Sequence, residues 1–161
     1  MNRLVVIAVA ATMVLLASCG FQLRGSYELP SHLSPVFLDK ESMSLPLYRE
    51  LTSRIKTSGA VTENADEAAS VITVMGENRS RDIRSVDSSG RASEYGLRYT
   101  LVFNVKSDGE LLIENGSIVR NRTLLFNPDA VLGVANEEQN LYEDMIEDAA
   151  GSLMMRLQAL K

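Results

Sequence analysis

The sequence predicts an α/β (α+β) two-layer sandwich: a four-stranded mixed sheet with two helices packed on one face, in the order β-α-β-β-β-α. Two apolar runs, at residues 36–38 and 71–75, flank a segment with apolar residues every four positions, which gives a strand–helix–strand unit. Residues 97–105 then alternate apolar and polar side chains, as a half-buried strand does. An amphipathic pattern from residue 136 onward supplies the second helix. We therefore expect the face of the sheet opposite the helices to be exposed.

The first helix has signals at both ends. Ser44 can cap its first turn, and Pro46 lies within that turn, where an N–H group has no helical partner. Gly59 follows the last turn, at the position of a left-handed C-cap. The apolar positions share one face of the helix: Leu47, Leu51 and Ile55. The crossover between the two flanking strands is expected to be right-handed.

Three strands then follow as a meander. Residues 87–90, Asp-Ser-Ser-Gly, have the composition of a turn before the strand at 97–105. Asp108 and Gly109 mark a second hairpin. The last strand, residues 111–126, contains Asn115-Gly116, which predicts a bend or bulge. The sheet is therefore expected to end in two consecutive hairpins.

The final helix is expected to begin at Asn136, with Gln139 completing an approximate capping box and residues 129–135 forming the loop before it. Its apolar stripe comprises Leu141, Met145, Ala149, Leu153, Leu157 and Leu160. The carboxylates at 143–148 lie opposite this stripe, so they are interpreted as a solvated face rather than as an acid–base pair. They are Glu143, Asp144, Glu147 and Asp148.

The amino terminus predicts export. Arg3 precedes an apolar run that ends in small residues, the three-part pattern of a secretory signal. The run is shorter than the roughly 20 residues that a membrane-spanning helix needs. It closes on Leu16-Ala17-Ser18-Cys19, which resembles the bacterial lipobox, and Cys19 is the only cysteine of the chain. We expect residues 1–18 to be a cleaved lipoprotein signal peptide; the alternative is an ordinary cleaved signal followed by an incidental cysteine.

Cys19 is then the first residue of the mature chain, with a covalent diacylglycerol and an N-acyl lipid. Two or more acyl chains hold a protein on a membrane stably, whereas one chain does so only marginally. Gly20 is not the aspartate usually linked to inner-membrane retention, so the expected location is the periplasmic leaflet of the outer membrane. Residues 19–161 are enough for a single domain with one core, of which 19–35 are expected to form an extended tether.

The composition argues against several functions. With 16 basic and 21 acidic residues the formal net charge is −5, which disfavours nonspecific binding of nucleic acid. His32 is the only histidine and falls in the tether, so neither a catalytic histidine network nor a metal site is expected. Neither a Gly-x-Ser-x-Gly elbow nor a phosphate-binding glycine loop is present. We expect a protein that is not an enzyme and has no cofactor beyond the lipid on Cys19.

Arginine is the charged residue that recurs along the predicted strands and turns of the sheet. One interpretation is a set of outward-facing charges paired with nearby acids, each pair adding little stability. The other is that guanidinium groups on an exposed sheet bind phosphate or carboxylate partners; composition alone favours the first. The arginines are Arg79, Arg81, Arg84, Arg91, Arg98, Arg120 and Arg122, and the candidate acids are Asp82, Asp87, Glu94 and Glu114.

The order of the elements, the lipobox and four local motifs together resemble one family. The motifs are Cys19-Gly20-Phe21-Gln22-Leu23-Arg24, Glu94-Tyr95, Asn127-Pro128 and Asn136-Glu137-Glu138-Gln139. The chain resembles the LptE (LptE/RlpB) family of lipopolysaccharide-assembly lipoproteins over nearly all of its mature length. The resemblance implies two helices against a four-stranded sheet, in agreement with the elements above.

The resemblance also implies a function. It implies an outer-membrane lipoprotein that plugs and helps to assemble the LptD β-barrel in a 1:1 complex. The resemblance implies that this complex is the translocon that delivers lipopolysaccharide to the outer leaflet. It also implies that the lipoprotein binds lipopolysaccharide directly. Basic residues at the hairpin tip and in the loop before the last helix are implied contacts. Arg91 is the matching position here, with Arg84 and Arg98 as further candidates, whereas loop residues 130–135 include no basic residue. The alternative is another outer-membrane lipoprotein that acts as a periplasmic scaffold or small lipid carrier.

Overall fold

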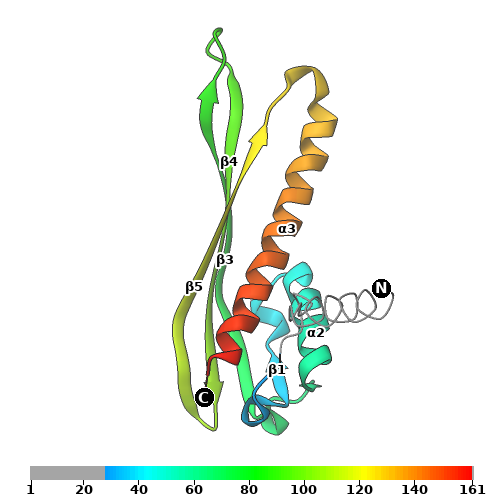
Figure 1. The fold of residues 1–161 in the computed structure, drawn as a ribbon, viewed down its shortest axis with the longest axis vertical. Helices are drawn as coiled ribbons and strands as arrows, with labels where there is room; N and C mark the ends of the chain where they lie inside the picture. The colour runs from blue at the N-terminus through cyan, green and yellow to red at the C-terminus, as the bar shows by residue number, and fades with distance from the viewer. Residues whose placement is uncertain (1–27, 161) are drawn as a thin grey trace, which may run out of the picture.

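The computed structural model describes residues 28–160, and within this range it contains one five-stranded sheet and two long helices (Figure 1). The sheet has the strand order β2-β1-β3-β4-β5. Strand β1 pairs in parallel with both β2 and β3, and β3, β4 and β5 form an antiparallel meander. The elements are β1 (Val36–Leu38), α2 (Leu45–Ser58), β2 (Val61–Thr62), β3 (Ser70–Val86), β4 (Ala92–Ser107), β5 (Glu110–Leu125) and α3 (Val131–Gln158).

The mixed α+β class with two helices is confirmed, but the expected strand number is wrong. The additional strand is β2, which pairs with β1 through Val61 and Thr62. Two residues are too short to show a period of two, so the sequence carries no pattern for this strand. The connection from α2 reaches it directly: Gly59 has an extended backbone with φ of −171°, not the left-handed C-cap that we expected.

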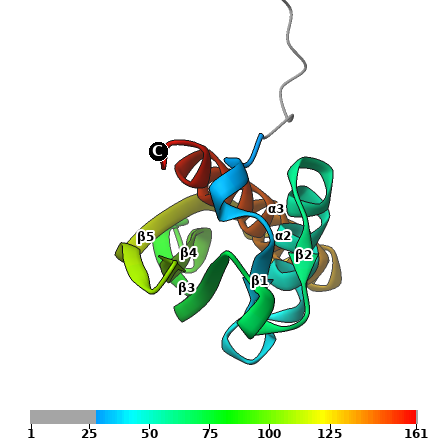
Figure 2. The same cartoon turned by 90° about the horizontal axis from the view of Figure 1, so that it is seen from below.

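The core lies between the sheet and the two helices, which cover the same face (Figure 2). From α2 it takes Leu47, Leu51 and Ile55, the expected apolar face, and all three are fully buried. The alternating residues of β4 form the other wall: Leu97, Tyr99, Leu101, Phe103 and Val105. Burying a large apolar side chain contributes about 1.5–3 kcal/mol, so these two rows make a large contribution to the stability of the fold. Within the described residues, none of the helices has the length and apolar composition of a membrane span.

The start of the final helix differs from the expectation. Helix α3 has 28 residues and begins at Val131, so residues 131–135 are its first turn rather than a loop, and Asn136 is an interior residue. A 3-10 turn at Pro128–Ala130 leads into it, with the Ala130 N–H donating to the Asn127 carbonyl at 3.1 Å. Ala130 provides no side-chain cap, which explains why the sequence shows no start signal at this point.

The second half of the expected tether packs on the domain instead of extending away from it. Ser31–Leu33 form a 3-10 turn, in which His32 is exposed and Leu33 is fully buried. Leu29 is buried as well. Cys19 and the signal peptide lie outside the described residues.

Both expected hairpins are present. Asp108 and Gly109 have φ of 50° and 83°, as a tight two-residue hairpin turn requires. The predicted bulge in β5 lies at Asn115, with φ of 48°, and its N–H donates to Asn104 Oδ1 at 2.7 Å. At Gly116 the bulge packs tightly, because a Cβ there would approach Ile113 to 2.7 Å and the Phe103 ring to 3.0 Å.

One carboxylate joins the sheet to the start of α2. Glu77, on β3, accepts hydrogen bonds from the Ser44 N–H at 2.9 Å, the Ser44 hydroxyl at 2.7 Å and the Tyr99 hydroxyl at 3.0 Å. Burial, and then the Glu77 charge, raises the pKa of Tyr99, so its hydroxyl stays protonated and continues to donate. A negative charge at a helix N-terminus also interacts favourably with the helix dipole.

We therefore expect Glu77→Ala to lower the free energy of unfolding by about 2 kcal/mol, because it leaves a buried hydroxyl and a helix cap without their acceptor. Urea denaturation of the purified chain measures this change. Glu110→Ala, an exposed carboxylate at the start of β5, is the control and should change stability by less than about 0.5 kcal/mol. Equal midpoints for the two variants would contradict the role given to Glu77.

Candidate functional site: the distal hairpin

The arginines lie mainly on the part of the sheet farthest from α2, at residues 78–100, which we call the distal hairpin (Figure 1). The face of the sheet on which each side chain of the hairpin lies can be determined from β4, because Leu97 and Tyr99 of this strand are buried against the helices. Directly paired residues of neighbouring strands share a face. We call the face toward the helices the inner face and the opposite face the outer face.

Four of the arginines lie on the inner face. Arg81 and Arg122 pair with Leu97 on either side of β4, and Arg79 and Arg120 pair in the same way with Tyr99. The expectation that the sheet arginines lie on the free face is therefore wrong for these four. They point toward α3.

These four arginines attach α3 to the sheet. Arg81 donates to Glu138 at 2.7 Å and lies 4.5 Å from the centre of the Tyr95 ring, and its pKa is raised chiefly by the hydrogen bond to Glu138. Arg79 lies 5.2 Å from the centre of the Tyr142 ring on α3. The other two contacts are Arg122 with the Asp148 carboxylate and Arg120 with the Ser152 hydroxyl.

The acidic partners therefore differ from most of those that we expected. Arg81 and Arg122 pair with Glu138 and Asp148 of α3, rather than with Asp82, Glu94 or Glu114 on the sheet. Glu94 instead accepts a hydrogen bond from the Ser85 hydroxyl at 2.6 Å. The carboxylates of α3 are thus only partly a solvated face: Asp148 holds Arg122, and Glu147 lies 3.4 Å from Arg54 of α2.

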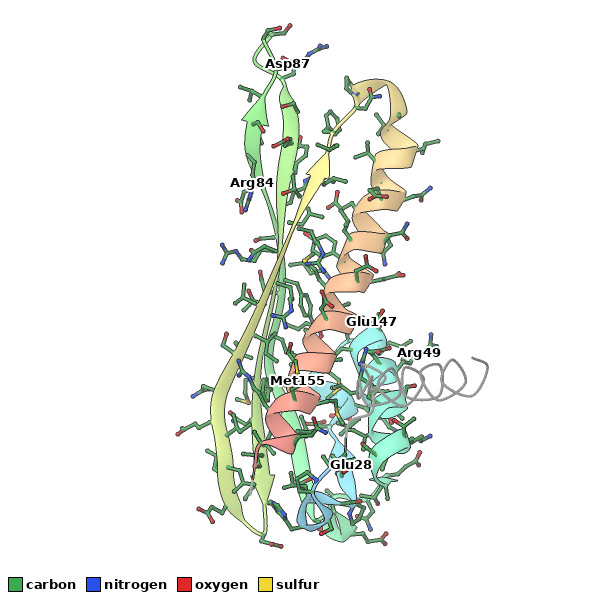
Figure 3. The ribbon with its side chains drawn as sticks, in the orientation of Figure 1. Glu28, Arg49, Arg84, Asp87, Glu147 and Met155 are labelled. Atoms are coloured by element: carbon green, nitrogen blue, oxygen red, sulfur yellow. The ribbon has the colours of Figure 1, made fainter. Side chains whose placement is uncertain are left out.

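The outer face carries Arg84 and Arg98. Arg98 lies between the inward-facing Leu97 and Tyr99, so it points outward. Arg84 is the extra residue of a β-bulge and lies over Gly96, where a Cβ would approach its Nε to 2.6 Å. Figure 3 shows Arg84 pointing away from α3. Both are exposed, and within the described residues neither has an ion pair or a hydrogen bond from its side chain.

Arg91 lies at the tip and has a partner there. Asp87 accepts from the N–H groups of Ser89 and Arg91 at 2.8 and 3.0 Å, and its second oxygen accepts from Arg91 Nε at 3.1 Å. These hydrogen bonds, first the one from the Arg91 backbone, lower the pKa of Asp87. Gly90, with φ of 75°, completes the turn. Arg91 thus keeps its terminal nitrogens available, but next to a compensating negative charge.

Exposed apolar side chains gather at the same end of the molecule, a feature that we did not anticipate. The hairpin tip, the end of β5 and the start of α3 all lie there (Figure 1). The exposed fraction is 85% for Leu132 and 70% for Leu125, and the group also includes Ile83, Val86 and Val131. The apolar run at 130–135 is a signal that could have identified part of this group. Apolar and cationic groups side by side favour a ligand or partner with both properties.

The described residues contain no group of three or more His, Cys, Asp or Glu side chains that could hold a metal ion. The site consists of exposed guanidinium groups, hydroxyl and amide groups on the outer face, and an apolar end. This combination can bind anionic and polar groups.

Comparison with known proteins identifies the family of the chain. The model of the LptE family, described as lipopolysaccharide-assembly, matches residues 33–157. The LPS-assembly lipoprotein LptE of Pectobacterium atrosepticum is 28% identical over 158 residues, covering 97% of this chain and 85% of that protein. The LPS-assembly lipoprotein LptE of Photorhabdus laumondii is 23% identical over 162 residues, covering 97% of this chain and 86% of the relative.

Solved structures show the same fold. The solution NMR structure of an uncharacterized lipoprotein B from Nitrosomonas europaea has a TM-score of 0.71 at 28% identity and covers 87% of this chain and 91% of its own. The crystal structure of the rare lipoprotein B from Shewanella oneidensis has a TM-score of 0.65 at 21% identity, covering 77% and 92%, and supports the fold alone. Because the family model matches most of the chain, this protein belongs to the LptE family of lipopolysaccharide-assembly lipoproteins.

Proposed function

We propose that this chain is an outer-membrane lipoprotein that plugs and helps to assemble the LptD β-barrel in a 1:1 complex, and that it binds lipopolysaccharide directly. Together they form the translocon that delivers lipopolysaccharide to the outer leaflet. Membership of the family supports the assembly role. The observation that carries the binding role is the pair of unpartnered arginines on the outer face of the distal hairpin.

The outer face has the chemistry of a surface that fits inside a barrel. The lumen of an outer-membrane barrel is lined by polar residues, so a plug needs hydrogen-bonding groups rather than an apolar surface. The register of the meander directs such groups outward along three neighbouring strands. They are Asn78, Ser80, Thr100, Asn121 and Thr123.

The outer arginines have the chemistry that lipopolysaccharide requires. Lipid A carries phosphate groups, and a guanidinium group donates two parallel hydrogen bonds to a phosphate. Arg84 and Arg98 are neighbours on the outer face because Arg84 lies over Gly96, two residues from Arg98. Their positive charges lie in a chain with a net charge of −5, so a specific anion site rather than bulk attraction supports binding. Arg91 at the tip adds a third guanidinium group.

The double variant Arg84→Ala/Arg98→Ala should weaken lipopolysaccharide binding about tenfold, because two charge-assisted phosphate contacts are lost. Arg91→Ala should have a smaller effect, because Asp87 already compensates its charge. Binding of labelled lipopolysaccharide to the full chain in detergent measures both. Arg49→Ala, an exposed arginine on α2, is the matched control (Figure 3). If the double variant binds as tightly as the control, the outer arginines are not the contact.

The barrel complex predicts a defined stoichiometry and a defined contact face. The full chain should co-purify with LptD in near-equal amounts, and a photo-crosslinking residue at Asn121 or Thr123 should couple to the barrel. A crosslinker at Lys56, near the end of α2, should couple less, since α2 lies on the other side of the sheet. Purification of the chain alone from gentle detergent, or crosslinks from Lys56 only, would argue for a scaffold or lipid carrier instead.

The lipid anchor is tested by the mass of the mature amino terminus. We expect a diacylglycerol thioether and an N-acyl chain on Cys19, and release of the Cys19→Ser variant from the membrane fraction, because the acyl chains supply the membrane affinity. An unmodified thiol on the native protein would refute the anchor without bearing on the distal hairpin.

A further inference from the structure

A second polar and apolar surface lies away from the distal hairpin, where β5 meets the last turns of α3. It is a pocket of about 380 Å³. Met155, on its α3 side, lies far from Arg84 along the molecule (Figure 3). The lining consists of Ser117, Ile118, Val119 and Arg120 from β5 and Ser152, Met155, Arg156 and Ala159 from the end of α3.

Guanidinium groups are fixed along the edge of β5 at this pocket. Strand β5 is the last strand of the sheet and pairs only with β4. Arg156 donates to the Ser117 carbonyl at 2.7 Å, and Arg120 donates to the Val119 carbonyl at 2.9 Å. Arg122 donates to the next alternate carbonyl, that of Asn121, at 3.1 Å. The heads of these side chains are thus held in place before any ligand arrives, which lowers the entropic cost of binding.

The charge around the pocket is unbalanced. Asp148 is the acidic partner of Arg122, and Arg120 contacts the Ser152 hydroxyl and the Asp148 carbonyl. Arg156 donates to the Ser117 carbonyl and lies 5.8 Å from the centre of the Phe103 ring. A guanidinium group carries more N–H donors than these contacts use. Three arginines therefore share one carboxylate, and donors of Arg120 and Arg156 remain free for an anion.

The other half of the lining is apolar and open. Met155 has an exposed fraction of 55%, and Ala159 is exposed as well. Ile118 also lines the pocket but is only 2% exposed. A free inorganic anion would leave these side chains in water, whereas an anion attached to an acyl chain would cover them and gain about 25 cal/mol for each Å² of apolar area removed from water.

We propose that this pocket binds the phosphate head of an amphiphile, with Arg120 and Arg156 on the phosphate and Met155 and Ala159 on the adjoining acyl chain. A guanidinium pair matches phosphate geometry, and the apolar half of the lining selects a phosphate that carries a tail. The site is separate from the distal hairpin and does not depend on the proposed barrel complex.

The test uses the full chain in detergent, labelled with ¹³C at the methionine methyl groups, so that Met155 reports binding by NMR. Three probes distinguish the contribution of the phosphate from that of the acyl chains: dihexanoylphosphatidic acid, inorganic phosphate and dihexanoylphosphatidylcholine. We expect a saturable shift of the Met155 methyl signal with phosphatidic acid at a concentration at least tenfold lower than with either of the other probes. Equal response to inorganic phosphate, or to the zwitterionic lipid, would overturn the proposal.

Two variants assign the site. Arg156→Gln should weaken phosphatidic acid binding at least fivefold, whereas Arg49→Gln on α2 should leave it unchanged. Ala159→Ser leaves every guanidinium contact in place and should reduce the preference for phosphatidic acid over inorganic phosphate, because it makes the apolar side of the pocket more polar. The buried Met145 and Met154 signals confirm that each variant is folded. If Arg156→Gln and Ala159→Ser both titrate like the control, the pocket is not the binding site.

Discussion

The alternating row of buried side chains on β4 is the constraint on which the rest of the structure depends. Leu97, Tyr99, Leu101, Phe103 and Val105 are each at most 1% exposed, and β4 lies between β3 and β5. Side chains alternate between faces along a strand, so a slip of one residue would turn this whole row to the solvent. The energetic cost of that slip fixes the register of both neighbouring strands.

The same register sorts the arginines. Because Arg79, Arg81, Arg120 and Arg122 stand opposite buried residues of β4, they face α3 and attach it through Glu138, Tyr142, Asp148 and Ser152. Arg98 occupies the alternate position, and the bulge that adds Arg84 turns a second guanidinium outward beside it. Arginine therefore has two roles here: it attaches α3 on the inner face and is exposed on the outer face. The position of each arginine relative to β4 determines its role.

The sequence predicted those elements whose apolar residues are periodic or whose ends carry capping or turn residues. The strand at 97–105, the helix after Ser44, both hairpins and the bulge at Asn115 are of this kind, and the family was recognised from motifs in order. Strand β2 was missed because it has two residues, and the start of α3 because Ala130 offers no cap.

The partners of the arginines could not be predicted for a different reason. Arg81 and Glu138 are 57 residues apart in the chain, and Arg122 and Asp148 are 26 apart. No local spacing indicates such pairs; they follow only from the packing of α3 along the sheet. Because Arg79 and Arg81 are two residues apart on a strand, periodicity places them on a common face, but it cannot say that this face is the one covered by α3. The outer position of Arg84 additionally depends on a bulge that nothing in the sequence marks.

The two edges of the sheet also bear on the proposed function. An open strand edge presents unpaired backbone groups that can pair with another strand. Here β1 pairs with only residues 70–72 of β3, so the rest of β3 forms an open edge. On β5, by contrast, the carbonyls of Ser117, Val119 and Asn121 already accept guanidinium donors. The bulge at Asn115 interrupts the rest of that edge. The β5 edge is thus protected from strand pairing, and in the complex proposed above this side of the sheet would contact the barrel through side chains such as those of the outer face.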